Sequence, residues 1–535
     1  MSIFDTIVVK KHKRSTFDLS HDVKLTTDFG KLVPFMCEEV VPGDTWYNKS
    51  DVLVRFSPLI APVMHRMWVT THFFYVPFRL LWDNYEVFET GGKDGMQTAA
   101  FPKVAMLGQG TSDGRFKDTD GLWKHGSLAD YLNYPTSEEN FRGSGLGVSA
   151  LPFRAYQMIY NEYYRDENLE EEIAFSLGDG LVSTSSAEYN TLLTLRNRAW
   201  RKDYFTSALP WPQKGPSQAV PLIGNLSFDD NLSTPSRIKS SDGSKSSDIV
   251  LDSSGYVKAK NGSSYGTSII DNHAQLSFKE AGISINDLRR SSRIQQLYEA
   301  QARGGSRLKE WLLSVFGVNN DDLRLSRPQF LGGGNTPVQV TDILQTSQTT
   351  DSSPMGQYAG LGFSFGSSNS FKNTFKERGY IIGIVSVMPE CGYTEGLPRA
   401  YYKFDKLDFA LPQLADIGEQ EIYNYELSLR ANASGITSQV TDTFGYAPRY
   451  SEYKFIPNRV HGELKDMSSY GYWTLNRHYS TAPTLSQQFV TVDADADDLN
   501  RIFAVKDSKY PKLLCQISNA TKARRCMPYN PIPTL

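Results

Sequence analysis

A series of strand-like segments with strong apolar character runs from Leu32 to Phe88, and the rest of the chain is organised around it. It is rich in β-branched and aromatic residues, and turn signals divide it at Pro42-Gly43-Asp44, Ser57-Pro58 and Pro62. In residues 65–76 both alternating sets of positions are largely bulky and apolar. Such a strand must be covered on both faces, by a second sheet, by insertions or by neighbouring subunits. The pattern therefore predicts a β-sandwich.

Two other segments have the spacing of helices. Apolar and aromatic residues in 151–169 recur on one helical face, which predicts a helix inserted between strands, with its aromatic stripe in the core or in an interface. Residues 284–318 are predicted to be helical again, with a start signal at Asn286-Asp287 and a stop at Gly304-Gly305.

The later part of the chain returns to strands. Residues 378–388 are a continuous apolar run of strand length, which predicts a buried sandwich strand. We interpret 336–350 and 354–376 as strand, turn and glycine-rich loop, and 445–464 as the loops that end the sandwich. Three prolines in the last eight residues exclude a helix there, so 501–535 is predicted to be an extended arm.

Residues 216–275 differ from the rest in being rich in Ser, Gly, Asp, Lys and Asn. A segment with so few large apolar residues contributes little to a core and is predicted to be exposed. Short strand-like pieces at 247–250, 255–259 and 265–270 predict an ordered projection. The alternative is a surface loop that the fold merely tolerates.

Length and composition bound the possible classes of protein. A chain of 535 residues predicts two domains, or one domain with large insertions. The formal net charge of −3 argues against a globally basic nucleic-acid coat, but it leaves room for local basic faces. The four cysteines lack C-x-x-C spacing, so we expect buried free thiols, with disulfides or metal ligation as alternatives. No apolar run is long enough to span a bilayer and the N-terminus does not resemble a signal peptide, so we expect a soluble protein made in a reducing compartment.

Three basic clusters are candidates for contact with nucleic-acid phosphates, the alternative being a solvated surface. They lie near the N-terminus, in the second helical segment and near the C-terminus. Their members are Lys10, Lys11, Lys13 and Arg14; Arg289, Arg290, Arg293, Arg303 and Arg307; and Lys522, Arg524 and Arg525.

Residues 196–215 interleave basic side chains with aromatic rings. This mixture suits single-stranded nucleic acid, whose phosphates follow the charges while its bases stack on the rings. It also suits a subunit contact anchored by large aromatic residues. We favour the subunit interface, with Trp200, Tyr204, Phe205 and Trp211 as candidates.

The sequence carries no recognisable catalytic motif. The eight histidines are scattered, and no zinc-protease, nucleophile-elbow, phosphate-loop or calcium-loop spacing occurs. Adjacent acids such as Glu170, Glu171 and Glu172 are typical of solvated positions. We therefore predict a non-enzymatic protein that needs no cofactor.

Several segments, in this order, resemble the major capsid protein of the Microviridae, in the gokushovirus branch of these small single-stranded-DNA bacteriophages. They are EVVPGDTW (39–46), SPLIAPVMHRMWVTTHFFYVPFRLLWDNYEVF (57–88), LPFRAYQMIYNEYYRDENL (151–169) and FGYAPRYSEYKFIPNRVHGEL (444–464), with further matches at 196–215, 299–318, 327–333, 336–347 and 354–362. Together with the 32–46 region, these segments cover most of the chain apart from the Ser-rich block.

The resemblance implies a mainly β fold, an eight-stranded antiparallel jelly-roll β-sandwich with long loop and helical insertions. It also implies that sixty copies form a T=1 icosahedral shell around a circular single-stranded DNA genome. The expected partners are a small basic DNA-binding protein, a pilot protein, a scaffolding protein and a receptor on the bacterial host. The protein would be part of the virion, assembled in the host cytoplasm.

Pattern and resemblance together predict an organisation in seven parts. They are a basic arm (1–20), the first jelly-roll strands (21–90), loop and helical insertions (91–215), the exposed Ser-rich insertion (216–275), a basic helical insertion (276–335), the remaining strands and loops (336–500) and the C-terminal arm (501–535). By the resemblance, the Ser-rich insertion forms a protrusion at the threefold axis that faces the host. Its candidate contact residues are Ser240, Lys245, Tyr256 and Tyr265.

Two other classes of protein remain as alternatives. A lectin-like or carbohydrate-active β-sandwich enzyme would need a pair of carboxylates in an aromatic cleft. A monomeric receptor-binding or spike protein would share the exposed projection, but would lack a basic inner face. Both alternatives predict a chain that does not form closed shells.

Overall fold

The structure is a computed structural model, and it describes all but a set of short segments and the two ends of the chain. The described residues are 14–106, 122–136, 147–215, 225–226, 237–239, 246–251, 257–261, 264–265, 278–279, 285–304, 308–317, 326–344, 346, 356–430, 442–493, 497–507 and 510–529. The chain divides into two compact units, Met1–Pro212 with Gly305–Leu535, and Gln213–Gly304.

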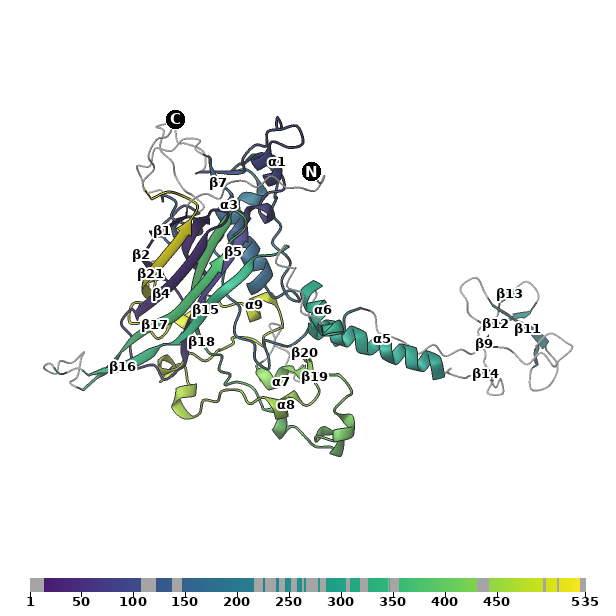
Figure 1. The fold of residues 1–535 in the computed structure, drawn as a ribbon. Coiled ribbons are helices and arrows are strands. Elements are labelled where there is room, and N and C mark those ends of the chain that lie inside the picture. Colours follow the sequence, from purple (N-terminus) through teal and green to yellow (C-terminus); the bar gives the residue numbers. More distant parts are fainter. Residues whose placement is uncertain are drawn as a thin grey trace. The chain divides into compact units, whose positions relative to one another are not determined.

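Two antiparallel sheets form the centre of the larger unit (Figure 1). The first sheet has six strands: β1 (Ser15–Asp18) and β2 (His21–Thr27), which both pair with β21 (Leu513–Arg525), then β4 (Thr45–Phe56), β17 (Tyr358–Thr374) and β16 (Gln339–Leu344). The second sheet has the order β15 (Gln329–Pro337), β5 (Met67–Pro77), β18 (Gly379–Pro389) and β3 (Val33–Val40).

The chain passes repeatedly from one sheet to the other. Strands β3, β4 and β5 alternate between the sheets, β15 continues across Val338 into β16, and β17, β18 and β21 alternate again. The predicted class, a mainly β protein built of antiparallel sheets, is confirmed. The eight-stranded jelly roll stays a prediction, which this alternation favours.

Aromatic rings from both sheets meet in the main core. The ring of Phe73 on β5 lies 5.6 Å from that of Phe35 on β3 and 5.0 Å from that of Phe371 on β17, which belongs to the opposite sheet. Around them pack buried β-branched residues such as Val54 and Val385. Each such side chain stabilises the fold by roughly 1.5–3 kcal/mol when it leaves water.

The outer face of the second sheet is covered by an insertion that follows β5. Phe74 of β5 and Ile384 of β18 pack there against helix α3 (Leu151–Ile159) and its neighbours. The guanidinium of Arg154, itself buried, donates to the carbonyls of Leu81 (3.0 Å) and Gly178 (2.9 Å), which fixes the helix to the loops around it. The prediction that residues 65–76 are covered on both faces is therefore confirmed.

The other elements of this covering insertion are short. They are the 3-10 helix η1 (Phe78–Leu80), α1 (Tyr85–Thr90), β6 (Lys103–Ala105), α2 (Leu128–Tyr131), β7 (Gly147–Ser149), the π-helical turn η2 (Tyr160–Tyr164), β8 (Leu181–Val182) and α4 (Ala187–Leu193). The predicted helix at 151–169 thus exists, but it ends at Tyr164, and its aromatic stripe belongs to the core.

Two segments in the second half of the chain differ in part from the sequence prediction. Residues 354–376 belong to the region interpreted as strand, turn and glycine-rich loop, and 358–374 form one long strand, β17. Its glycines permit close packing, because a Cβ on Gly362 would lie 2.8 Å from the Phe56 ring. Residues 513–525, assigned to an extended arm, form β21 inside the first sheet. The residues of this strand alternate between buried and exposed positions, a pattern that predicts a strand, but the nearby prolines favoured an arm instead.

The smaller unit combines short strands with one long helix. The strands are β9 (Asn225–Leu226), β10 (Arg237–Lys239), β11 (Ser246–Leu251), β12 (Val257–Asn261), β13 (Ser264–Tyr265) and β14 (Phe278–Lys279), and the helix is α5 (Ile285–Gly304). Strands β11 and β12 confirm two of the predicted strand-like pieces, whereas residues 266–270 of the third lie outside the described residues. Helix α5 ends at Gly304, as predicted, and α6 (Leu308–Phe316) begins the return to the larger unit.

The sequence predicts that the four cysteines are free thiols and that they are buried, and the structure agrees with the first point and in part with the second. All four are free thiols; Cys391 and Cys515 are buried, whereas Cys37 and Cys526 are only half-buried. No disulfide joins any two of them.

The two-sheet core predicts a sharp contrast between two phenylalanine positions. Phe73 is fully buried between the sheets, so Phe73→Ala should lower the free energy of unfolding by about 3–5 kcal/mol, because it removes apolar contacts and leaves a cavity. Phe365→Ala on the exposed face of β17 should change it by less than about 0.5 kcal/mol, since that ring is 61% exposed. Denaturant unfolding of the two purified variants measures the difference, and equal effects would contradict the packing described above.

Candidate functional site

Large apolar side chains are exposed throughout one segment of the larger unit, residues 401–470. Phe404 is 83% exposed and Ile456 is 74% exposed. We call this set the aromatic surface: Tyr401, Tyr402, Phe404, Leu407, Phe409, Ile417, Leu429, Tyr453, Phe455, Ile456, Met467 and Tyr470. Monomeric soluble proteins rarely leave so much apolar area in water, and where they do, the area marks a site of interaction.

The backbone under the aromatic surface is built of short elements. They are η4 (Arg399–Tyr401), η5 (Lys406–Asp408), η6 (Pro412–Leu414), β19 (Glu419–Tyr423), α7 (Asn424–Leu427), β20 (Thr443–Pro448), α8 (Ser451–Lys454) and η7 (Gly462–Lys465); η8 (Gly471–Trp473), α9 (Gln487–Val490) and α10 (Asp497–Asn500) follow. Among the residues of this segment that the structure describes, regular packing comes from the pairing of β19 with β20 and from a small cluster around Phe205 and Phe444. Other interactions must therefore hold this segment in place.

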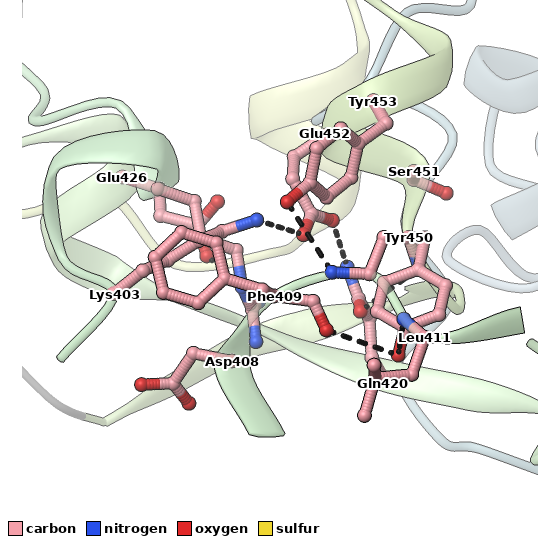
Figure 2. Close-up of polar contacts among 12 residues, drawn as sticks. Lys403, Asp408, Phe409, Leu411, Gln420, Glu426, Tyr450, Ser451, Glu452 and Tyr453 are labelled. Carbon is pink, nitrogen blue, oxygen red and sulfur yellow. Dashed lines mark hydrogen bonds and ion pairs between the residues drawn. The ribbon is translucent and has the colours of Figure 1, made fainter. Parts of the chain in front are cut away.

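The first of these interactions centres on Glu452 of α8. Its carboxylate accepts hydrogen bonds from the Lys403 ammonium (3.0 Å) and the Gln420 amide (2.7 Å), which converge on it in Figure 2. The Lys403 nitrogen also lies 3.9 Å from the centre of the Tyr453 ring. Burial opposes ionisation of Glu452, but the hydrogen bonds from Gln420 and Lys403 outweigh it, so its pKa is lowered.

Tyr450, next to this carboxylate, fixes the neighbouring loop. Its φ of 63° is a left-handed conformation that residues other than glycine adopt at a cost. The Tyr450 backbone N–H donates to the Gln420 side chain (3.0 Å). The hydroxyl accepts a hydrogen bond from the Leu411 N–H (3.1 Å) and donates to the Phe409 carbonyl (3.4 Å), as Figure 2 shows. The strained residue therefore positions residues 409–411 at the aromatic surface.

Two further glutamates fasten the same segment. Glu426, which is 6% exposed, accepts from the hydroxyl of Tyr204 (2.8 Å) and from Arg399 (3.2 Å), and burial raises its pKa. Glu395 accepts two parallel bonds of 2.9 Å from Arg430. Glu395, Glu426 and Glu452 are referred to below as the anchoring glutamates.

The environment of Glu395 strongly favours its charged form. Burial opposes ionisation, but hydrogen bonds from His478 and Arg430, with the N–H of Tyr479, outweigh it and lower the pKa of Glu395 to about 2. Ser428 adds a further bond of 3.1 Å. The carboxylate thereby joins three separate stretches of chain.

This arrangement suits binding rather than catalysis. The donors to each anchoring glutamate come from other stretches of this chain, so the three carboxylates serve to hold the segment together. Among the described residues, no group of three or more His, Cys, Asp or Glu side chains could hold a metal ion. None of the helices in the described part of the chain is both long and apolar enough to cross a membrane.

The predicted interface residues require a correction. Trp200, Tyr204 and Phe205 are 7%, 8% and 3% exposed, because they pack into the cores of this chain. Only Trp211 is partly accessible. The signal for the aromatic surface was the aromatic-rich but irregular segment around 401–409, where exposed rings have no strand or helix period to follow.

The predicted DNA-contact residues fall into three groups. Arg14, Arg289, Arg290, Arg293, Arg303, Lys522 and Arg524 are exposed. Arg525 instead turns inward, where it bonds to the buried Asp44 (2.9 Å) and stacks over Trp46. Lys10, Lys11, Lys13 and Arg307 lie outside the described residues, as do the host-facing candidates Ser240, Lys245 and Tyr256; Tyr265 is described only as part of the backbone of β13.

Comparisons with known proteins agree on one family. The family model "Capsid protein (F protein)" matches residues 6–535. The chain is 32% identical to the capsid protein VP1 of Chlamydia phage 1, over 99% of this chain and 97% of that protein. It is 32% identical to the capsid protein VP1 of Bdellovibrio phage phiMH2K (94% and 91%), and 30% identical to that of Spiroplasma virus 4 (98% and 95%).

The lowered pKa of Glu395 predicts an acid-dependent loss of stability. Because the folded-state pKa lies below the unfolded value, this group stabilises the fold above pH 4.5, and the stabilisation is lost as the pH falls from about 4.5 to about 2. Its loss should amount to about 2–3 kcal/mol. Urea unfolding between pH 7 and pH 2.5 should show a weaker acid dependence in Glu395→Gln than in the unaltered chain.

A matched control is Glu421→Gln, which changes the exposed glutamate of β19. It should leave the acid dependence of unfolding as in the unaltered chain. Identical curves for the Glu395 and Glu421 variants would contradict the role given to Glu395.

Proposed function

This chain belongs to the capsid protein (F protein) family, and on that premise we propose that sixty copies of it build a T=1 icosahedral shell around a circular single-stranded DNA genome. As a phage capsid protein it is a structural component of the virion and not an enzyme. The number of copies, the enclosed genome and the attachment to a host belong to the proposal.

The observation that carries the proposal is the aromatic surface. A chain that leaves Phe404 and Ile456 exposed on loops held firmly by the anchoring glutamates has an interaction surface ready before any partner arrives. Obligate assemblies bury extensive, largely apolar interfaces of this kind. A second copy of the chain supplies the matching surface at each contact of a closed shell.

The remaining partners follow from what such a shell must contain and do. The genome inside is accompanied by a small basic DNA-binding protein and a pilot protein, and a scaffolding protein assists assembly in the cytoplasm of the bacterial host. The smaller unit, which carries the Ser-rich residues, is the segment that meets the host receptor. Its compactness as a separate unit supports this role.

A monomeric receptor-binding or lectin-like protein is the alternative. It would share the exposed projection, but it would remain a 60.1 kDa monomer. Negative-stain microscopy and sedimentation of the protein, expressed with its neighbouring phage proteins, distinguish the two. Uniform closed shells support the capsid proposal, and a persistent monomer across salt and pH conditions would overturn it.

The aromatic surface predicts which substitutions stop assembly. Phe404→Ser combined with Ile456→Ser should reduce the yield of closed shells at least tenfold, because it removes two apolar anchors from the contact. The variant should remain folded, since substitution of exposed side chains rarely costs more than about 0.5 kcal/mol. Sedimentation measures the shells and circular dichroism the fold.

The control is Met96→Ser, which removes an apolar side chain that is 85% exposed but lies outside residues 401–470. Shell yield should stay at the unaltered level. If the Phe404/Ile456 variant assembles as well as this control, the aromatic surface is not an assembly contact.

A further inference from the structure

The outer face of the first sheet differs from that of the second. The insertion around α3 covers the second sheet, whereas the first sheet leaves large side chains open to water within the described part of the molecule. Tyr47 on β4 is 49% exposed, Phe365 on β17 is 61% exposed and Leu514 on β21 is 50% exposed. Three adjacent strands, which Figure 1 shows side by side, therefore each present a large side chain on this face, with Tyr47 near one end of β4 and with Phe365 and Leu514 opposite Leu53 and Arg55 toward its other end.

The register of these strands places Tyr47 between two lysines. Lys522 on β21 lies directly opposite Tyr47 on one side, and Lys372 on β17 lies directly opposite it on the other. Side chains that face each other across neighbouring strands are about 5 Å apart at Cβ, so the Cβ atoms of the two lysines lie on either side of Tyr47 and roughly 10 Å from each other. Lys49, two residues along β4, is on the same face.

The whole face is basic. Six exposed cations lie on it: Lys24, Lys49, Arg55, Lys372, Lys522 and Arg524. Among the described residues, none of the six forms an ion pair, although Asp18 of β1 lies directly opposite Lys522 and interacts with it electrostatically. The acids of this face are Asp18, Asp22 and Asp51, of which Asp18 and Asp22 accept hydrogen bonds from Ser20 and Ser518. Six positive charges against three negative ones leave a positive surface.

Within the described part of the chain, the Tyr47 ring has no partner. No hydrogen bond or ring contact joins it to another described residue. Solvated surfaces usually intersperse charges of both signs, whereas on this face the cations outnumber the acids around an exposed ring. The arrangement instead has the two parts that single-stranded nucleic acid requires, cations for the phosphates and a ring on which a base stacks.

We infer that the outer face of the first sheet is the surface on which this capsid protein holds single-stranded DNA, with Tyr47 stacking on a base and Lys49, Lys372 and Lys522 binding the flanking phosphates. This inference rests on the proposed enclosure of a DNA genome and deepens it by naming the contact. Single strands fit because their bases are free to stack, whereas the bases of a duplex are already stacked on each other.

The basic residues of helix α5 make a useful comparison. Arg289, Arg290 and Arg293 are exposed as well. The two residues between Arg290 and Arg293 are the serines Ser291 and Ser292, so no exposed aromatic ring lies between these arginines. They offer charge without a stacking surface. They therefore provide a control with the same change in charge and no expected effect on base stacking.

The test replaces the three lysines together, Lys49→Gln, Lys372→Gln and Lys522→Gln, in the full chain expressed with its phage neighbours. Closed particles should form in normal yield, because all three side chains are exposed, and the nuclease-resistant DNA per particle should fall at least threefold. The matched control, Arg289→Gln, Arg290→Gln and Arg293→Gln, removes the same charge and should keep more DNA than the lysine variant. Closed particles with unaltered DNA content in the lysine variant would overturn the inference and leave the capsid proposal intact.

Tyr47 has a separate readout. Tyr47→Phe keeps the ring and should keep the DNA content, whereas Tyr47→Leu should lower it. Ultraviolet cross-linking of unaltered particles, followed by mass spectrometry, should join DNA to the peptide that contains Tyr47. Cross-links found only on other faces would contradict the inference, whereas a failure of the unaltered chain to form particles would count against the proposed function itself.

A second measurement covers the case in which the lysine variant fails to assemble. Binding of unassembled subunits to oligo(dT) should weaken at least tenfold in the lysine variant. The slope of log affinity against log salt should become shallower by about 2, since each phosphate contact to a single strand contributes about 0.7. Unchanged affinity and slope would also overturn the inference.

Discussion

The need to cover two strands on both faces shapes most of this molecule. Strands β5 and β18 lie in the middle of the second sheet and carry apolar residues on both sides, so neither can face water. The first sheet covers one side, where Phe73 meets Phe371. Helix α3 and the loops after β5 cover the other, where Phe74 and Ile384 are buried. The sandwich and its largest insertion therefore both serve to cover the two apolar faces of β5 and β18.

What the chain leaves uncovered is equally informative. The aromatic surface and the outer face of the first sheet remain exposed, one rich in apolar rings and the other rich in cations. A capsid subunit needs both kinds of open surface, because it must bind its own copies and also lie beside a polyanion. The contrast between the covered second sheet and the open first sheet gives the subunit two chemically different sides.

The anchoring glutamates show how an exposed apolar surface can be held in place without a large core beneath it. Burying a carboxylate costs free energy, and the cost is offset only when donors satisfy it well. Glu395 and Glu452 meet that condition, because their donors lower the pKa of each, whereas burial still raises the pKa of Glu426 despite its hydrogen bonds. All three join separate stretches of chain. The result is a surface whose geometry the rest of the chain fixes, and under the proposed assembly such a pre-formed surface would reduce the entropy lost when copies associate.

Local sequence patterns determined the elements of this protein, and the tertiary structure decided its surfaces. Alternation in residues 65–76 was enough to predict a strand covered on both faces, and helical spacing was enough to locate α3 and α5, because both signals are contained in neighbouring residues. The same reasoning missed the full length of β17 and the pairing of β21, where close-packed glycines suggested a loop and nearby prolines suggested an arm. It also assigned Tyr204 and Phe205 to an interface, since composition cannot tell a buried ring from an exposed one. Only strand register brings Tyr47, Lys372 and Lys522 together, because residues hundreds of positions apart become neighbours through hydrogen bonds that no local pattern encodes.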